Sequence, residues 1–192
     1  METNQILDLF KQCNAIMSGH FLLTSGRHSD TYMQCAKLFE DPQISEKLCK
    51  ELLQIKKDLQ VDIVVSPAIG GILMGYEVAK QLGVKNIFAE RVDGQMTLKR
   101  GFTVPQGSKV LVVEDVVTTG GSIQEVIALL QSLQTTVVAC CSIVDRSNGK
   151  TTFPVPYFSL LSLEVTSHTP QECPQCQDPT IPPAYKMGSR NN

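Results

Sequence analysis

The sequence predicts an α/β fold in which a central, mostly parallel β-sheet is flanked by helices. Short runs of β-branched and apolar residues alternate along the chain with segments whose apolar residues recur at helical spacing. This alternation is typical of βαβ units and of a parallel sheet that is covered on both faces. The chain has 192 residues, of which 42% are hydrophobic and 19% are charged. These values suit one globular domain over residues 1–192 with a core of its own.

The first half of the chain is expected to contain two helices and then a strand–helix–strand unit. Proline is tolerated in the first turn of a helix, so a helix can begin at Pro42, and a glycine such as Gly83 commonly follows the last turn. In order, the expected elements are a helix over 6–17 that ends at 18–20, a helix after Asp41, a strand over 61–66, a helix ending at Gly83 and a strand over 86–90.

The second half is expected to begin with a long polar loop or hairpin over residues 91–108. The elements expected after it are a strand over 109–113, a helix over 122–134 and strands over 137–144 and 157–161. Ligands of open parallel sheets bind beyond the carboxyl ends of the strands. The loops expected to form a site are therefore 66–71, 90–102, 114–121 and 145–150.

The strongest functional motif follows the strand at 109–113. Two adjacent carboxylates, Glu114 and Asp115, come first, and a loop of two threonines and two glycines (residues 118–121) leads into the next helix. Glycine lets backbone N–H groups approach a phosphate, and a helix N-terminus favours an anion. Carboxylates repel that phosphate but suit a neighbouring pair of hydroxyls, so the motif predicts a ribose phosphate site. A capping box of Ser122 and Glu125 is a purely structural alternative, but it does not account for the two carboxylates.

The segment VVEDVVTTGGS (residues 112–122) resembles the phosphoribosyl diphosphate (PRPP) motif of the type I phosphoribosyltransferases. Four further segments are similar to parts of the orotate phosphoribosyltransferases, and together they extend the resemblance over roughly residues 1–165. They are GHFLLTSGRHSDTY (19–32), SPAIGGI (66–72), FAERVDGQMTLKRGF (88–102) and IVDR (143–146). The resemblance implies transfer of ribose 5-phosphate from PRPP to orotate in pyrimidine biosynthesis, with release of pyrophosphate.

The resemblance also assigns residues and partners. It implies a PRPP site of Glu114, Asp115, Val116, Val117, Thr118, Thr119, Gly120, Gly121, Ser122 and Arg91, and an orotate site of Thr118, Arg146, Tyr32 and Arg27. Catalytic roles fall on Asp115, Arg91 and Lys99. Mg²⁺ is expected to be carried by the diphosphate. The chain is expected to form a homodimer whose partners share active sites through Arg91, with residues 1–40 and 155–192 forming a hood over the base.

Several positions depart from the family pattern or have a structural alternative. Thr24 stands where the orotate enzymes commonly have lysine, and the mobile loop lacks the usual lysine and histidine soon after Arg91. Lys99 or Arg100 can supply the missing charge, or both can be solvated hairpin cations. Arg146 and Arg27 are candidates to pair with the orotate carboxylate. Alternatively, Arg146 caps the end of a strand and Arg27 lies in a surface turn.

Composition limits the partners and the compartment. The formal net charge of −2 argues against a nucleic-acid partner, which normally requires a basic surface. The N-terminus lacks the basic start and apolar run of a signal peptide, and no apolar run is long enough to span a bilayer. The seven cysteines are an odd number and lie mostly in apolar segments, which favours free thiols and a cytoplasmic location.

Two cysteines, Cys173 and Cys176, have the spacing of half a structural zinc site. No second pair completes four ligands, although His168 is a candidate third ligand, so we interpret this pair as a reduced turn facing solvent. His20 and His28 are interpreted as hydrogen-bonded surface residues. The alternatives to an orotate enzyme are a purine phosphoribosyltransferase, a non-catalytic PRPP sensor and, last, a redox or zinc protein.

Overall fold

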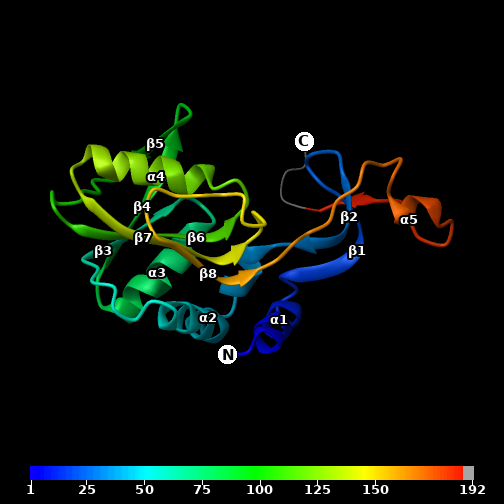
Figure 1. Ribbon diagram of the computed structural model, residues 1–192, viewed down its shortest axis with the longest axis horizontal. Coiled ribbons are helices and arrows are strands. Elements are labelled where there is room, and N and C mark those ends of the chain that lie inside the picture. The colour runs from blue at the N-terminus through cyan, green and yellow to red at the C-terminus, as the bar shows by residue number, and fades with distance from the viewer. Residues whose placement is uncertain (188–192) are drawn as a thin grey trace.

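The computed structural model describes residues 1–187 and confirms the α/β class (Figure 1). Its main sheet has six strands in the order β5-β4-β3-β6-β7-β8. All neighbours pair in parallel except β4 and β5, which form an antiparallel hairpin. The strands are β3 (Ile63–Pro67), β4 (Lys85–Val92), β5 (Gln95–Leu98), β6 (Lys109–Val117), β7 (Thr136–Asp145) and β8 (Tyr157–Ser162).

Helices cover both faces of this sheet, and each face has its own core (Figure 1). Helices α2 (Pro42–Gln54) and α3 (Gly71–Leu82) pack on one face, and α4 (Gly121–Ser132) packs on the other. Along β6, Leu111 and Val113 face the first core, whereas Val110 and Val112 face the second. Successive side chains of a strand point to opposite faces, so a strand buried on both faces is apolar throughout.

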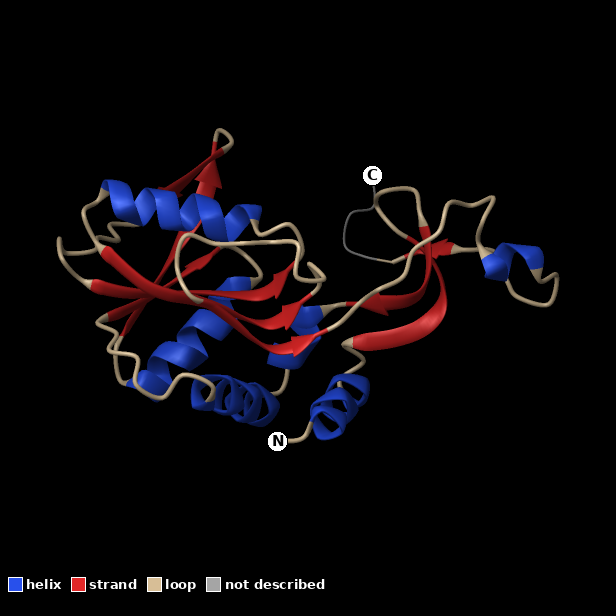
Figure 2. Cartoon of the chain, in the orientation of Figure 1, coloured by secondary structure: helices blue, strands red, loops and turns tan. Residues whose placement is uncertain are grey.

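A second, three-stranded sheet is built from both ends of the chain (Figure 2). It has the order β2-β1-β9 and comprises β1 (Ile16–Leu22), β2 (His28–Met33) and β9 (Tyr185–Lys186). The short helix α5 (Pro174–Gln177) lies beside it. Helix α1 (Thr3–Gln12) precedes β1, and the 3₁₀ helix η1 (Cys35–Phe39) follows β2 and leads to α2 in the main body. The arrowheads of β6, β7 and β8 point toward this sheet, so it faces the carboxyl ends of the main strands.

The boundaries of α2 and α3 agree with the sequence. Asp41 caps α2 by accepting a hydrogen bond from the Gln43 backbone N–H at 2.8 Å, and Pro42 occupies the first helical turn. Gly83 follows α3 with φ of 70°, a left-handed conformation that glycine adopts without steric cost.

The first helix is shorter than the sequence predicts, and that part of the prediction was wrong. Helix α1 ends at Gln12, and Ile16 and Met17 belong to β1, where they pair with β2. Asn14 has φ of 53°, which ends the helical path. The apolar residues on either side happen to keep helical spacing, so periodicity alone did not reveal the break. Residues 18–20 therefore continue β1 and do not terminate a helix.

Two further boundaries were corrected around the acidic motif. Strand β6 continues to Val117, so Glu114 and Asp115 lie within the strand and not beyond it. Gly120, not Ser122, is the N-cap residue of α4, so the capping box of Ser122 and Glu125, which was the structural alternative, does not form. Within residues 1–187, no helix has the length and apolar composition needed to cross a bilayer.

Candidate active site

The two acidic side chains of β6, Glu114 and Asp115, share one buried environment near the carboxyl end of the strand. Asp115 is buried, with 8% of its surface exposed, and its Oδ1 accepts a hydrogen bond from the Val116 backbone N–H at 2.9 Å. Burial together with the neighbouring Asp115 carboxylate raises the pKa of Glu114 to about 9. Burial also raises the pKa of Asp115. A pair held in this way is under-solvated and suits hydroxyl groups that donate to both carboxylates.

The turn before α3 lies directly against this acidic pair. A Cβ atom on Gly70 would lie 2.8 Å from Asp115 Oδ1, and one on Gly71 would lie 3.1 Å from Glu114 Oε1. Only glycine therefore fits here without displacing the carboxylates. The turn 66–72 and the acidic motif, which are more than 40 residues apart in the sequence, therefore lie against each other.

The loop between β6 and α4 encloses a hollow of about 50 Å³. A water molecule occupies about 30 Å³ in the liquid, so this hollow suits one small polar group. The residues that line it are Glu114, Val116, Val117, Thr118, Thr119, Gly120, Gly121, Ser122 and Ile123. It therefore contains all the residues expected around the 5′-phosphate, at the N-terminus of α4, where backbone N–H groups and the helix dipole favour an anion.

Replacing Gly120 with alanine is expected to destabilise the fold and distort the phosphate loop. Gly120 has φ of 78°, and a Cβ atom there would lie 2.4 Å from Thr151 Cγ2 and 2.9 Å from Phe153 Cζ. The control is Gly149→Ala, because Gly149 has φ of 70° but nothing within 4 Å of the added atom. Thermal unfolding should show a loss of about 1 to 3 kcal/mol for the Gly120 variant, and clearly less for the control. Equal losses would mean that the contacts with Thr151 and Phe153 do not matter.

Arg91 is held at the end of β4 by an ion pair that the sequence did not predict. Its Nη2 donates to Glu125 Oε1 at 2.8 Å and to Glu125 Oε2 at 2.7 Å. Both side chains are roughly half exposed, so the pair is worth little to stability. Glu125 thus fixes the direction of the arginine and takes no part in a helix cap.

The two other loop cations differ in their contacts. The Arg100 guanidinium donates to Glu90 at 3.2 Å and lies 5.6 Å from the centroid of the Phe88 ring. Lys99 is exposed on the same turn, just after β5. Because Glu90 already engages Arg100, Lys99 is the better candidate for a contact with a diphosphate.

Arg146 follows β7 next to the acidic motif. Its backbone N–H donates to the Val117 carbonyl at 2.8 Å, whereas its Nε is buried without a hydrogen-bond partner within residues 1–187. A buried, unsatisfied guanidinium nitrogen is costly and points to a ligand. Cys35 of η1, which the sequence did not single out, lies nearby. Burial raises its pKa, as does Asp115, while Arg146 lowers it.

The other two residues assigned to the base lie in the second sheet. Tyr32 packs against Phe21, with ring centroids 5.5 Å apart, and lines a hollow of about 210 Å³ with Met17 and Lys37. Arg27 donates through Nε to Ser167 Oγ at 2.9 Å and through Nη2 to the Ser167 carbonyl. These bonds favour its structural alternative, in which Arg27 attaches the C-terminal segment to the turn before β2.

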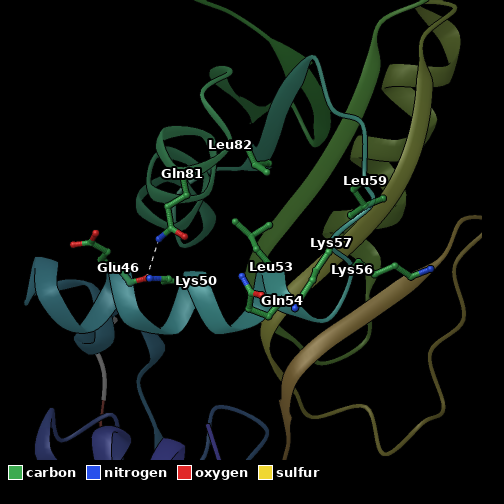
Figure 3. Close-up of a pocket in the computed structure, with 9 residues that line it drawn as sticks. All are labelled: Glu46, Lys50, Leu53, Gln54, Lys56, Lys57, Leu59, Gln81 and Leu82. Carbon is green, nitrogen blue, oxygen red and sulfur yellow. Dashed lines mark hydrogen bonds between the residues drawn. The ribbon is translucent and has the colours of Figure 1, made fainter.

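Another hollow, of about 520 Å³, lies away from all of these residues (Figure 3). It is formed by the end of α2, the segment after it and the end of α3, where Gln81 Nε2 donates to the Glu46 carbonyl at 2.8 Å. This is the amino end of β3, opposite to the end where parallel sheets bind ligands. We therefore do not assign the substrate site to it.

The interpretation of Cys173 and Cys176 as a turn facing solvent was wrong for Cys173, which is buried, whereas Cys176 is exposed. The structure places both thiols beside the rings of His20 and His28, which come from β1 and β2. His168 is elsewhere and forms a backbone bridge with His28. No sequence pattern joins these positions, because about 150 residues separate the histidines from the cysteines.

Comparison with known proteins identifies the family. The phosphoribosyl transferase domain family matches residues 37–164. The orotate phosphoribosyltransferase of Thermoanaerobacter sp. (strain X514) is 53% identical over 99% of both chains. That of Chlorobium phaeobacteroides (strain DSM 266) is 49% identical over 100% of this chain and 98% of its own.

Solved structures give the same result for the fold. The crystal structure of orotate phosphoribosyltransferase from Aeropyrum pernix has a TM-score of 0.69 and 27% identity, over 82% of this chain and 93% of that one. An adenine phosphoribosyltransferase from Thermoanaerobacter pseudethanolicus has a TM-score of 0.60 at 19% identity, over 69% and 88% of the two chains, and shares the fold alone. The relatives that are about half identical over nearly the full length of both chains are orotate phosphoribosyltransferases, not adenine phosphoribosyltransferases. This chain therefore belongs to the orotate phosphoribosyltransferases.

Proposed function

We propose that this protein transfers the ribose 5-phosphate group of PRPP to orotate, giving orotidine 5′-monophosphate and pyrophosphate for pyrimidine biosynthesis. The observation that carries the proposal is the convergence of three parts at the carboxyl end of β6. These are the buried acidic pair, the anion-binding loop at 118–122 and the turn containing Gly70 and Gly71. The comparisons favour orotate over a purine base or a non-catalytic PRPP sensor.

The acidic pair is suited to the ribose. With the 5′-phosphate on the loop at 118–122, the 2′- and 3′-hydroxyls would donate to Glu114 and Asp115. Those hydrogen bonds would stabilise the ionised carboxylates and so counteract the rise in their pKa values that burial causes. As the anomeric carbon loses pyrophosphate it gains positive charge, and ionised carboxylates beside the ring stabilise that charge more than they stabilise the ground state.

The diphosphate needs cations, because its negative charge increases as it leaves. Arg91 and Lys99 are our candidates among the side chains, and closure of the hairpin at 92–102 would exclude the water that otherwise hydrolyses PRPP. Mg²⁺, when bound to the diphosphate oxygens, neutralises charge on the leaving group and requires few protein ligands. The acidic pair fits this arrangement, since it offers oxygen ligands next to the turn that contains Gly70 and Gly71.

The base is proposed to lie between Arg146 and the second sheet. The buried, unpartnered Nε of Arg146 is suited to a carboxylate, and Tyr32 offers a flat ring. Deprotonated orotate supplies its own ring nitrogen as the nucleophile, so a protein base is not required.

The reaction should require a divalent cation. We expect purified protein to consume orotate and release pyrophosphate only when PRPP and Mg²⁺ are both present, because Arg91 and Lys99 cannot offset the charge of the diphosphate alone. The test follows orotate absorbance with excess chelator, then with Mg²⁺ restored. Full turnover in the chelator would contradict the magnesium requirement, and no orotate consumption under any condition would contradict the proposed function.

We further propose a cytoplasmic homodimer. Ile69, Leu73 and Tyr76 are 85%, 56% and 63% exposed, and their spacing places them on one side of α3 and the turn before it. An exposed apolar stripe of this kind is typical of an interaction surface. A second copy seated there would lie beside Gly70 and Gly71, close enough to contribute a basic loop to the site. The odd number of cysteines fits a reducing compartment.

Shared active sites can be tested by mixing two variants whose activity is reduced. In hybrids of Arg91→Ala with Asp115→Asn, one site would carry both substitutions and the other neither, so random exchange should restore about a quarter of wild-type activity. The control mixes Asp115→Asn with the double variant, which leaves no intact site. Absence of recovery after proven subunit exchange would show that Arg91 acts within its own chain.

A further inference from the structure

Four side chains with metal-binding atoms meet in the second sheet, outside the substrate site. His20 comes from β1, His28 from β2, and Cys173 and Cys176 from the start and body of α5. Their four ligand atoms all lie within 4.8 Å of one another. We call these residues the Cys/His cluster. His20 and Cys173 are buried, with 5% and 1% of their surfaces exposed.

The distances within the Cys/His cluster fit a tetrahedral ion. His20 Nε2 lies 3.1 Å from His28 Nδ1 and 3.4 Å from Cys173 Sγ. Cys176 Sγ lies 3.6 Å from His20 Nε2 and 3.2 Å from His28 Nδ1. In a tetrahedral zinc site, sulfur ligands at about 2.3 Å and nitrogen ligands at about 2.0 Å from the metal are separated from one another by about 3.3 to 3.8 Å. Four of the six separations among these atoms are therefore within a few tenths of an ångström of that geometry, and the other two are no longer than 4.8 Å.

Hydrogen bonding alone does not explain why these groups converge. His20 Nδ1 lies 2.9 Å from the Pro182 carbonyl oxygen, which can only accept, so Nδ1 carries the proton. In the neutral ring, Nε2 then has a single lone pair. Three groups crowd that lone pair, the two thiols and the Nδ1 of His28. One metal ion satisfies all of them, and the bond to Pro182 orients the ring as outer-sphere partners of metal-bound histidines commonly do.

We propose that the Cys/His cluster binds one structural zinc ion. Two thiolates and two imidazoles are the ligands of structural zinc, and the Cys-x-x-Cys spacing matches. All four positions of the tetrahedron are filled by protein atoms, which leaves none for water or substrate. This site differs from the magnesium of the reaction, which is bound through oxygen atoms of the diphosphate.

The zinc would attach the C-terminal segment to β1 and β2. That segment contains only a four-residue helix and a two-residue strand, too little to bury a core, and small units of this kind commonly need a metal or a disulfide. Its other contacts include the pairing of β9 with β1, Arg27 to Ser167, the bridge between His28 and His168, and Gln175 Nε2 donating to the Gly19 carbonyl. Loss of the metal should therefore loosen residues 167–187 while the α/β body stays folded.

The test begins with metal analysis of the full-length protein, produced with added zinc salt and purified under reductant without chelator. We expect about one zinc ion per chain. Cys176→Ser and His28→Ala should each reduce the content at least tenfold. Cys176 is exposed, so its substitution is not expected to disturb packing. Cys13→Ser and His168→Gln are the matched controls and should keep their zinc, because neither residue is in the cluster.

Two further measurements keep the result independent of folding and of activity. Replacement of zinc by Co²⁺ should give the visible absorption of a tetrahedral ion bound to thiolates, and Cys176→Ser should weaken it. Limited proteolysis should cleave within 167–187 faster after chelation in wild type and without chelation in Cys176→Ser. The proposal is overturned if wild type has no stoichiometric metal, if its mass shows a disulfide between Cys173 and Cys176, or if both cluster variants retain zinc.

Discussion

Asp115→Asn is expected to reduce kcat/KM for PRPP by about 10- to 150-fold, the equivalent of a lost charge-assisted hydrogen bond of about 1.5 to 3 kcal/mol. The asparagine keeps the shape of the side chain and the bond from Val116, so the strand should not change. The substitution removes the negative charge beside the ribose. That charge stabilises the transition state most, because the ribose ring becomes positive there. Initial-rate kinetics with varied PRPP measure the loss.

The same variant should melt no lower than wild type. The folded protein holds the Glu114 proton up to a pKa of about 9, whereas the ordinary value is 4.5. Between these values the folded state binds more protons than the unfolded state, so its stability falls as pH rises. Asp115→Asn removes a neighbouring charge and should make this decline smaller.

The control for Asp115 is Asp62→Asn. Asp62 also accepts a hydrogen bond from a backbone N–H, that of Lys109 at 2.8 Å, but it lies at the amino end of the sheet. We expect its kcat/KM to be unchanged. Normal turnover by Asp115→Asn, accompanied by a large drop in melting temperature, would mean that Asp115 is structural.

Arg146→Met is expected to raise KM for orotate by about 10- to 150-fold and to leave KM for PRPP nearly unchanged. Methionine keeps much of the apolar stem but cannot pair with the orotate carboxylate, and a bond between two charged groups is worth about 1.5 to 3 kcal/mol. Stability should not fall, because the buried Nε has no partner within residues 1–187 to lose. Steady-state kinetics with each substrate varied in turn will separate the two effects.

Arg27→Met is the matched comparison for Arg146→Met. Arg27 already bonds to Ser167, so its loss should lower the melting temperature and leave KM for orotate nearly unchanged. The opposite pattern, in which Arg27 controls orotate binding and Arg146 does not, would mean that the orotate carboxylate binds at the second sheet. Equal losses for PRPP and orotate in Arg146→Met would indicate a general disturbance of the site.

The body of the fold was predictable because its signals are local. Strand β6 is apolar on both faces, α2 begins at a capping aspartate and a proline, and α3 ends at a glycine. The acidic motif and its glycine loop are contiguous, so the loop that encloses the hollow between β6 and α4 could be predicted from one segment. The break after α1 could not, because Ile16 and Met17 continue the helical spacing across it.

Contacts between distant segments could not be predicted from the sequence. Nothing local pairs Glu125 with Arg91, and the residue looked like half of a capping box. The Cys/His cluster brings β1 and β2 against α5, and only the chain path through the second sheet makes those four residues neighbours. The orphaned Nε of Arg146 is likewise a property of packing.

The most direct test of the central claim is a competition assay in which orotate, uracil, hypoxanthine, xanthine and adenine are supplied at equal concentration with PRPP and Mg²⁺. A purine would leave Arg146, whose Nε is buried without a partner within residues 1–187, without a carboxylate to pair with, which disfavours the purine by several kcal/mol at most. Thr24 stands where the family commonly has a lysine. The missing cation should weaken orotate binding without reversing the preference for orotate over purines. We predict that orotate is consumed first and that the purines remain. Faster consumption of any purine than of orotate would contradict the assignment.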